Sequence, residues 1–434
     1  MKGNIIKGFS KLHEQEKRRM VSGLCLHPEE AVRTMEQMIF TDEKLREKFM
    51  DLSENTISSH HLPYGIAPNF VINGNIFHVP MVIEESSVIA AAASAARFWS
   101  ERGGFRITDL SATKVGHVYF RWFDQPALLK EKWTLIRPQL LHRLKDFTAN
   151  MERRGGGVSK LELIDDSVRI DKLFRLKVSF ETVDSMGANF INTCLEELAR
   201  GLNEMLNTDE DTNRQLCQVV MAILSNYTDE CTVTVEIGCE KKALKGITGG
   251  LNVQAFTDKV ALAYEIASKD IYRATTHNKG IMNGIDAVLI ATGNDFRAAE
   301  AAAHAYASRT GRYQALSWCS TDNNALYIRL RLPLSVGTVG GITNLHPLAR
   351  LSLEILGNPN ASELMGIVAS VGLASNFAAI QSLVTTGIQK GHMKLHLTNI
   401  LNILNATPQQ RTEALVHFEG RTVSFAAVKA FLND

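Results

Sequence analysis

Apolar and polar residues alternate along the chain with two different periods. Between residues 11 and 53, apolar positions recur at helical spacing among many charges, which predicts two or three helices. After residue 69 the period shortens to two, and residues 70–72 and 75–79 flank the pair Asn73-Gly74. Because Asn-Gly readily supplies the two positive φ angles of a type I′ turn, this segment predicts a β-hairpin.

A pair of acids, Glu84 and Glu85, follows the second strand of this hairpin. An Ala-rich run then predicts a helix from about residue 88 to 102, with Ser86 or Ser87 as its N-cap. The two acids are therefore expected at a strand-to-helix junction. Like charge and burial can raise the pKa of one carboxyl and suit it to act as a general acid. Alternatively, both acids simply favour the positive end of the helix.

Strands and helices are both expected in the rest of the chain. Residues 105–183 are rich in β-type alternation, and the pattern beyond residue 252 is mostly helical with glycine-rich loops. The expected helices are 127–152, one from residue 188 to about 206, and one from 296 to about 310; the expected strands are 158–163, 173–183, 231–237 and one that starts at 332 and runs into a glycine loop.

Composition indicates an ordinary globular protein. The 434 residues suffice for two or three domains, and 45% are apolar and 21% charged, which excludes a mainly disordered or coiled-coil chain. The formal charge of +1 gives no global field for nucleic acid or anionic membranes. Six scattered cysteines without a C-x-x-C pair fit a reducing compartment. The most apolar helical run, 88–99, is too short to span a membrane, so we expect a cytoplasmic protein without nucleic-acid or membrane partners.

The segment 276–286 has an unusual combination of side chains. Lys279 lies among His277, Asn278 and two glycines in an otherwise apolar stretch, although lysine is seldom buried without a partner. It is either a solvated loop lysine or a cation held where negative charge develops on a substrate oxygen. Asp295, sixteen residues further on, either pairs with Lys279 or caps the helix that follows it.

The turn 184–189 joins an expected strand to a long expected helix. The free N–H groups at a helix start attract anions, so this turn is either a pyrophosphate-binding site or an ordinary βα turn. The G-x-G-x-x-G, P-loop and H-E-x-x-H motifs are missing. His392 and His396 are four residues apart but have no carboxylate nearby in sequence, so no metal site is expected.

These segments, taken together and in this order, resemble the bacterial (class II) form of 3-hydroxy-3-methylglutaryl-CoA (HMG-CoA) reductase. The similarity runs from about residue 9 to the C-terminal segment. The matching segments are 54–55, 62–65, 69–74, 79–85, 184–189, 277–285, 293–295 and 391–393.

The resemblance implies an α+β fold in three parts. Residues 1–111 and 226–385 would form a large, mainly helical domain that binds HMG-CoA and carries the catalytic groups. Residues 112–225 would form an inserted small ferredoxin-like domain, which binds the dinucleotide without a Rossmann fold. Residues 386–434 would form a C-terminal flap. The family further implies a homodimer, or a higher assembly of dimers, with active sites at the subunit interface.

The implied reaction is the four-electron reduction of HMG-CoA to mevalonate and CoA by two NAD(P)H, or its reverse. The catalytic residues would be Glu85, Lys279, Asp295 and His392. Substrate-binding positions would be Lys11, Ser87, Asn226, Arg273, Asn283 and His396. Cofactor-binding positions would be Asp184, Met186, Gly187, Ala188, Asn189 and Lys160. Lys160 stands where NADH-preferring members carry an acid, so NADPH is the expected cofactor and NADH the alternative.

The sequence departs from the usual family pattern at two places, and two other functions remain as alternatives. Ser86 replaces a common proline after the two acids, and residues 54–58 differ from the usual family motif. A CoA-dependent acyltransferase would need a nucleophile such as Cys194 or Cys319 beside a base. A non-catalytic CoA-binding protein would not need Lys279, Glu85 and His392 together.

Overall fold

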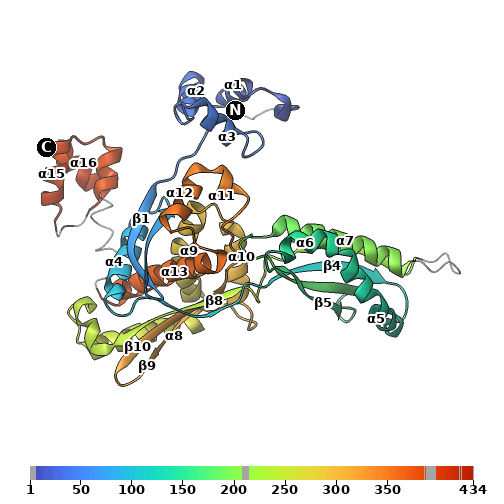
Figure 1. Cartoon of the computed structure of the whole chain (residues 1–434). Coiled ribbons are helices and arrows are strands. Elements are labelled where there is room, and N and C mark those ends of the chain that lie inside the picture. The colour runs from blue at the N-terminus through green and yellow to red at the C-terminus, as the bar shows by residue number, and fades with distance from the viewer. Residues whose placement is uncertain are drawn as a thin grey trace. The chain divides into compact units, whose positions relative to one another are not determined.

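The structure is a computed structural model that describes residues 6–207, 215–385, 387, 397–419, 421 and 423–433 (Figure 1). The chain divides into two compact units, residues 1–63 and 64–434. In the first unit, a short 3-10 turn (η1, Phe9–Lys11) precedes helices α1 (Glu14–Ser22), α2 (Pro28–Gln37) and α3 (Glu43–Met50). These three helices confirm the helical pattern predicted for residues 11–53. The predicted three-part boundaries differ from this division and stay a prediction.

The second unit begins with the predicted hairpin. Strands β1 (Tyr64–Ile72) and β2 (Asn75–Val82) pair antiparallel. Asn73 and Gly74 have φ angles of 47° and 85°, as a type I′ turn requires. Helix α4 (Val88–Ser100) packs on β1, and α9 (Ile271–Ala291) packs on β2 (Figure 1).

The start of α4 differs from the prediction. Ser87 occupies the N-cap position, but its φ of 77° is left-handed and its side chain makes no capping hydrogen bond. A residue in the left-handed region cannot present the extended backbone that a normal serine cap uses. The chain therefore turns sharply between Glu85 and the helix.

Within the described residues, one four-stranded antiparallel sheet belongs to the main core. Its strand order is β3-β8-β10-β9. Their bounds are β3 (Arg106–Leu110), β8 (Thr232–Glu240), β9 (Ser317–Thr321) and β10 (Ala325–Pro333). Val235, Ile328 and Leu330 turn one face into the core. The strand predicted to start at residue 332 is wrong, because β10 ends at Pro333, whose nitrogen has no hydrogen to donate to a ladder.

A second four-stranded antiparallel sheet has the order β5-β6-β4-β7. Its elements follow the chain order β4 (Lys114–Trp122), α5 (Pro126–Arg143), α6 (Lys145–Glu152), β5 (Gly157–Asp165), β6 (Leu173–Glu181), α7 (Ala188–Leu206) and β7 (Cys217–Leu224). This βαββαβ connectivity with antiparallel pairing confirms the expected ferredoxin-like sheet. The single helix expected at 127–152 is instead two helices that meet at Leu144, and β7 was not predicted.

This second sheet has a hydrophobic core of its own. Buried residues such as Phe120, Leu176 and Leu198 form a cluster that draws only on positions between residues 118 and 217. Helix α7 packs on β4 and β7, while α6 packs on β5. A separate core is what an inserted domain needs.

Helix α9 crosses the longest apolar helix, α13 (Ala361–Val384), at the centre of the main core. A Cβ at Gly284 would lie 2.8 Å from the Val371 carbonyl oxygen, and one at Gly372 would lie 2.8 Å from Ile285. Glycine at these positions therefore lets the two helices approach closely. The remaining elements of this part are η2 (Lys241–Ile247), α8 (Val253–Lys269), α10 (Phe296–Ala307), α11 (Ile342–Leu345) and α12 (Pro347–Ile355).

Helix α13, and not the run 88–99, is the most apolar helix among the described residues. Its 24 residues are long and apolar enough to cross a membrane, but 67% of its most apolar window is buried inside the protein. Burial on all sides is typical of the central helix of a large core. At the C-terminus, α15 (Pro408–His417) and α16 (Phe425–Asn433) belong to a small cluster with buried Leu401, Phe418 and Val428.

Candidate active site

The structure brings Glu85 and Lys279 together, although 194 positions separate them in the chain. The Lys279 ammonium donates to Glu85 Oε2 at 2.7 Å. Asn283 Nδ2 donates to the same oxygen at 3.3 Å. Lys279 and Asn283 lie one turn apart on α9, so their side chains share a helix face. A cation, a carboxyl and an amide thus meet at the junction of β2 and α4.

The backbone at this junction is held in an unusual conformation. Buried Val79 and Met81 fix the end of β2 in the core, and Glu85 comes three residues after the last residue of the strand. Two residues later Ser87 has a positive φ, which costs free energy for any residue with a Cβ. The tight turn keeps the Glu85 side chain outside the core and next to α9.

Lys279 does not lie on a loop, because α9 is helical from Ile271 to Ala291. The residues just before it anchor that helix. His277 Nε2 lies 2.6 Å from Ser317 Oγ and 3.2 Å from Asn376 Nδ2, and Asn278 bonds to the backbone of Gln314 and Leu316. Burial, assisted by the Arg273 charge, lowers the pKa of His277 to about 3. His277 is therefore a neutral anchor at physiological pH.

The two charged groups remain open to solvent within one protomer. The Lys279 side chain is 59% exposed and the Glu85 side chain 41% exposed. An exposed ion pair contributes little to stability. The pair is thus better suited to meeting a ligand than to holding the fold together.

Asp295 occupies a different position from the one expected for a partner of Lys279. Its Oδ1 accepts from the backbone N–H groups of Arg297 and Ala298, at 3.1 and 3.2 Å. Its Oδ2 lies 3.0 Å from the Arg297 guanidinium. The N-cap interpretation is confirmed, and in this structure Lys279 pairs with Glu85 instead of Asp295.

The turn before α7 is built for close backbone approach. Gly187 has a φ of 82°, and a Cβ there would lie 2.9 Å from Thr182 Cβ. Asp184 Oδ1 accepts from the Ala361 N–H at 2.9 Å, which ties the turn to the start of α13. Among the described residues no side chain caps the start of α7, so its first N–H groups are available to an anion. This arrangement fits the diphosphate of a dinucleotide.

The other predicted positions are spread over several elements. Ser87 lies beside Glu85, and Arg273 lies half-buried in the first turn of α9. Exposed Asn226 lines a small cavity together with Met186 and Ala188. Lys160 lies on β5 and pairs with Glu162 at 2.9 Å. Lys11 is exposed in the first unit, and His392 and His396 lie outside the described residues.

Two ionisable side chains near these residues were not predicted from the sequence. Lys114 is buried below the turn before α7, and its only sequence signal is a lysine at the start of a largely apolar strand. Asp286, the last residue of the lysine segment, lies on α9 close to Glu300 of α10. Burial and the Glu300 carboxyl raise the pKa of Asp286 to about 8. No motif signals that pair, because the two helices meet only in the fold.

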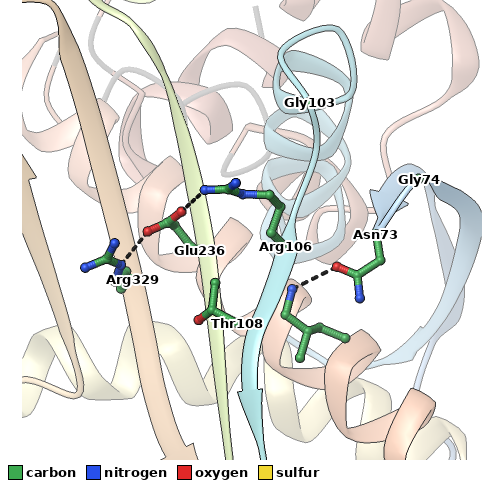
Figure 2. A pocket seen from close by; sticks show the side chains of 8 residues that line it. Asn73, Gly74, Gly103, Arg106, Thr108, Glu236 and Arg329 are labelled. Carbon is green, nitrogen blue, oxygen red and sulfur yellow. Dashed lines mark hydrogen bonds and ion pairs between the residues drawn. The ribbon is translucent and has the colours of Figure 1, made fainter.

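A separate polar cavity lies on the solvent face of the main sheet. Figure 2 shows Glu236 of β8 between Arg106 of β3 and Arg329 of β10. Both guanidinium groups pair with the buried Glu236 carboxylate, and the three residues are direct neighbours across the strands. One carboxylate thus links two cations across three neighbouring strands, and the row keeps a net charge of +1. In the described part of the chain, no cluster of three or more His, Cys, Asp or Glu side chains is placed to hold a metal ion.

Comparison with known proteins places the chain in a family. The family model described as hydroxymethylglutaryl-coenzyme A reductase matches residues 14–397. The chain belongs to this family. A 3-hydroxy-3-methylglutaryl-coenzyme A reductase of Archaeoglobus fulgidus is 35% identical over 404 residues, which cover 93% of this chain and 88% of that protein. A probable reductase of Borreliella burgdorferi is 34% identical over 354 residues, covering 82% and 78%.

Solved HMG-CoA reductase structures have the same fold. The Streptococcus pneumoniae class II enzyme bound to NADPH in open conformations has a TM-score of 0.71 at 37% identity, covering 87% of this chain and 99% of that one. Another structure of the S. pneumoniae enzyme has a TM-score of 0.72 at 35% identity, covering 98% and 99%. The predicted family, fold class and enzyme class are therefore confirmed, and an acyltransferase or a non-catalytic CoA-binding protein is not favoured.

Proposed function

We propose that this HMG-CoA reductase reduces (S)-HMG-CoA to mevalonate and CoA with two molecules of NADPH. The family match and the identity to curated reductases support this activity. The Streptococcus pneumoniae structure bound to NADPH supports the cofactor. The same groups serve the reverse reaction, so the proposal covers both directions.

The observation that carries the proposal is the cluster of Lys279, Glu85 and Asn283. Hydride addition to a thioester carbonyl turns its oxygen into an oxyanion, which a nearby ammonium stabilises. The oxygen then needs a proton, which a carboxylic acid beside that ammonium can donate. The 2.7 Å contact between Lys279 and Glu85 supports a site where both groups reach one substrate oxygen.

The two hydride steps use these residues in turn. In the first step, NADPH delivers hydride to the thioester carbon and Lys279 stabilises the oxygen of the resulting hemithioacetal. The hemithioacetal anion then collapses to the aldehyde and releases the CoA thiolate, which His392 protonates. In the second step, a second NADPH that has replaced the oxidised cofactor would supply hydride to the aldehyde, and Glu85 would protonate the alkoxide. We assign Asp295 to tuning this network from the start of α10, and Ser87, Arg273, Asn226, Lys11 and His396 to substrate binding.

We assign the dinucleotide to the start of α7 and its selection to Lys160. A cation near the adenosine ribose favours the 2′-phosphate of NADPH, whereas an acid favours the 2′-hydroxyl of NADH. Lys160 is exposed on β5, and its ammonium pairs with Glu162, so a phosphate would compete with that carboxylate for the cation. Lys160→Asp should shift the ratio of kcat/KM for NADPH and NADH by roughly ten- to hundredfold toward NADH. A ratio that does not move would exclude Lys160 as the selector.

The cysteines do not support an acyltransferase. Burial raises the pKa of Cys194 and of Cys319 to about 12. A thiol with that pKa is protonated at neutral pH, and the thiolate is the nucleophilic form. Neither cysteine therefore offers the activated nucleophile that acyl transfer requires.

We further propose that the enzyme works in the cytoplasm as a homodimer, or an assembly of dimers, without membrane or nucleic-acid partners. The solvent exposure of Lys279 and Glu85 in one protomer leaves room for a partner subunit to complete the site. Light scattering on the purified protein tests the assembly. A monomer with full activity would contradict it.

One assay tests the reaction. The absorbance of NADPH is followed with HMG-CoA as substrate, and released CoA is measured with a thiol reagent. Two NADPH oxidised per CoA released is the expected result. Lys279→Ala should lower kcat by about 10²–10³-fold, because the oxyanion loses its cation. Wild-type protein that releases CoA without oxidising NADPH would contradict the reductase assignment.

A further inference from the structure

A buried lysine lies below the turn that leads into α7. Lys114 is the first residue of β4, and its relative exposure is 4%. Its ammonium donates to Thr182 Oγ1 and, at 2.8 Å, to the carbonyl oxygen of Ser185. The Thr182 hydroxyl also donates to that carbonyl oxygen, at 2.6 Å. One side chain of the sheet therefore fixes both ends of the turn 182–185.

Burying this ammonium is unfavourable on its own. Burial lowers the pKa of Lys114, while Cys231, Glu181 and Asp184 act in the opposite direction. A neutral donor would make the same hydrogen bonds without the cost of desolvating a charge. Holding the turn therefore does not by itself explain why the residue is a lysine.

The cavity beside Lys114 connects it to the proposed dinucleotide site. Lys114, Met186, Ala188 and Asn226 line a cavity of about 20 Å³, which has room for a single water molecule. An ammonium has three N–H donors, and the described contacts use two of them on the turn. The cavity is too small for a nucleotide. A dinucleotide would bind above it, against the turn and the start of α7.

We propose that Lys114 is a positioning residue for the dinucleotide. It holds the turn 182–185 so that the first N–H groups of α7 face the diphosphate. Its buried positive charge adds to the positive end of the helix dipole at the same place. This inference rests on the proposed function, because it names the part of that site that binds the anionic centre of NADPH.

The test measures NADPH binding and turnover separately. Lys114→Met keeps an unbranched side chain that is one atom shorter and removes its charge and its donors. NADPH affinity, followed by the fluorescence of the bound nicotinamide, should weaken about tenfold. The KM for NADPH should rise by the same factor, whereas kcat at saturating NADPH and the KM for HMG-CoA should stay within about twofold. A merely structural loss would lower kcat through inactive protein and leave both KM values unchanged.

Two further variants make the result unambiguous. Lys145→Met removes an exposed lysine from the start of α6 and should change none of these constants. Thr182→Val keeps the Lys114 charge but removes two hydrogen bonds of the turn, the one that Thr182 accepts from Lys114 and the one that it donates to the Ser185 carbonyl. A loss of about threefold in NADPH affinity is therefore expected even if Lys114→Met does not fold. If Lys114→Met folds, unchanged NADPH affinity in that variant would overturn the inference. If it does not fold, unchanged NADPH affinity in Thr182→Val would do so. A wild-type protein that binds NADPH but does not reduce HMG-CoA would contradict the proposed function and leave this test intact.

Discussion

At the scale of single residues, Glu84 and Glu85 are adjacent acids with different surroundings. The Glu85 carboxylate contacts Lys279 and Asn283 of α9. Both acids lie between β2 and α4 and are exposed. Only Glu85 is therefore placed to share a substrate oxygen with the cation.

This difference predicts that the two carboxyl groups have separable effects. Glu85→Gln should lower kcat by about 10²-fold or more, since an amide cannot donate the proton that a general acid supplies. Glu84→Gln should lower it only a few-fold, through the weaker field at the start of α4. The measurement is kcat at saturating HMG-CoA and NADPH. Equal losses in both variants would indicate a general electrostatic effect at the helix start.

His277 predicts a pH dependence of stability. Its pKa in the folded protein is about 3, below the ordinary value of 6.5, so the unfolded chain binds this proton more readily. The stability that the neutral ring contributes is fully present above pH 6.5 and is lost as the pH falls toward 3. His277→Gln should be less stable than wild type at pH 7.5, and the gap should narrow by about 1.4 kcal/mol per pH unit below 6.5.

Urea unfolding of both proteins at pH 7.5, 6 and 5 measures this gap. All other acid-sensitive groups are common to the two proteins, so their contributions cancel in the difference. A gap that stays constant with pH would show that His277 does not remain neutral in the folded state.

At the scale of elements, helix α9 carries Lys279, and the packing of α9 against α13 determines where that lysine lies. Gly284 follows Asn283 directly, and a Cβ there would meet the Ser375 side chain and the Val371 carbonyl oxygen. The carbonyl belongs to a helix and cannot move aside easily. The position of Lys279 thus depends on a glycine on the opposite side of α9.

Gly284→Ala should destabilise the protein by about 1–3 kcal/mol, because it forces α9 away from α13. The same shift should separate Lys279 from Glu85 and lower kcat. Gly280→Ala is the matched control on the same helix, since a Cβ there meets nothing within 4 Å. It should raise stability by up to about 1 kcal/mol through helix propensity. Similar melting temperatures for the two alanine variants would contradict this view of the α9–α13 contact.

The elements that were predicted correctly are those set by local chemistry. The Asn73-Gly74 turn fixes its hairpin through two backbone angles, and Asp295 caps α10 through its own next residues. Strand β7 was missed because apolar side chains occupy both of its faces, so its sequence shows no alternation of apolar and polar residues. Val220, Met221 and Ile223 are all more than half exposed on this edge strand. The break between α5 and α6 was also missed, because the sequence has no proline or glycine at Leu144.

At the scale of the whole molecule, the candidate site depends on contacts that no local pattern encodes. Spacing singled out Lys279 and the acid pair separately, and only the resemblance placed them in one site. The fold then paired Lys279 with Glu85, where local reasoning had considered Asp295. The ion pair joins the hairpin junction to the central helix, so it requires the packing of α9 against β2.

The last prediction concerns the C-terminal segment. The buried members of the main core extend no further along the chain than Ile380, and residues 397–432 include a hydrophobic cluster of their own. A chain that ends at residue 385 should therefore still fold and bind NADPH. It should lose turnover by about 10²–10⁴-fold, because the segment contains His392, the proposed proton donor to the CoA thiolate. Full-length His392→Gln is the matched control and should show the same loss if proton donation is the main contribution of the segment. A truncated protein with wild-type kcat would refute a catalytic flap. A truncated protein that no longer melts cooperatively would show that the main core needs the segment.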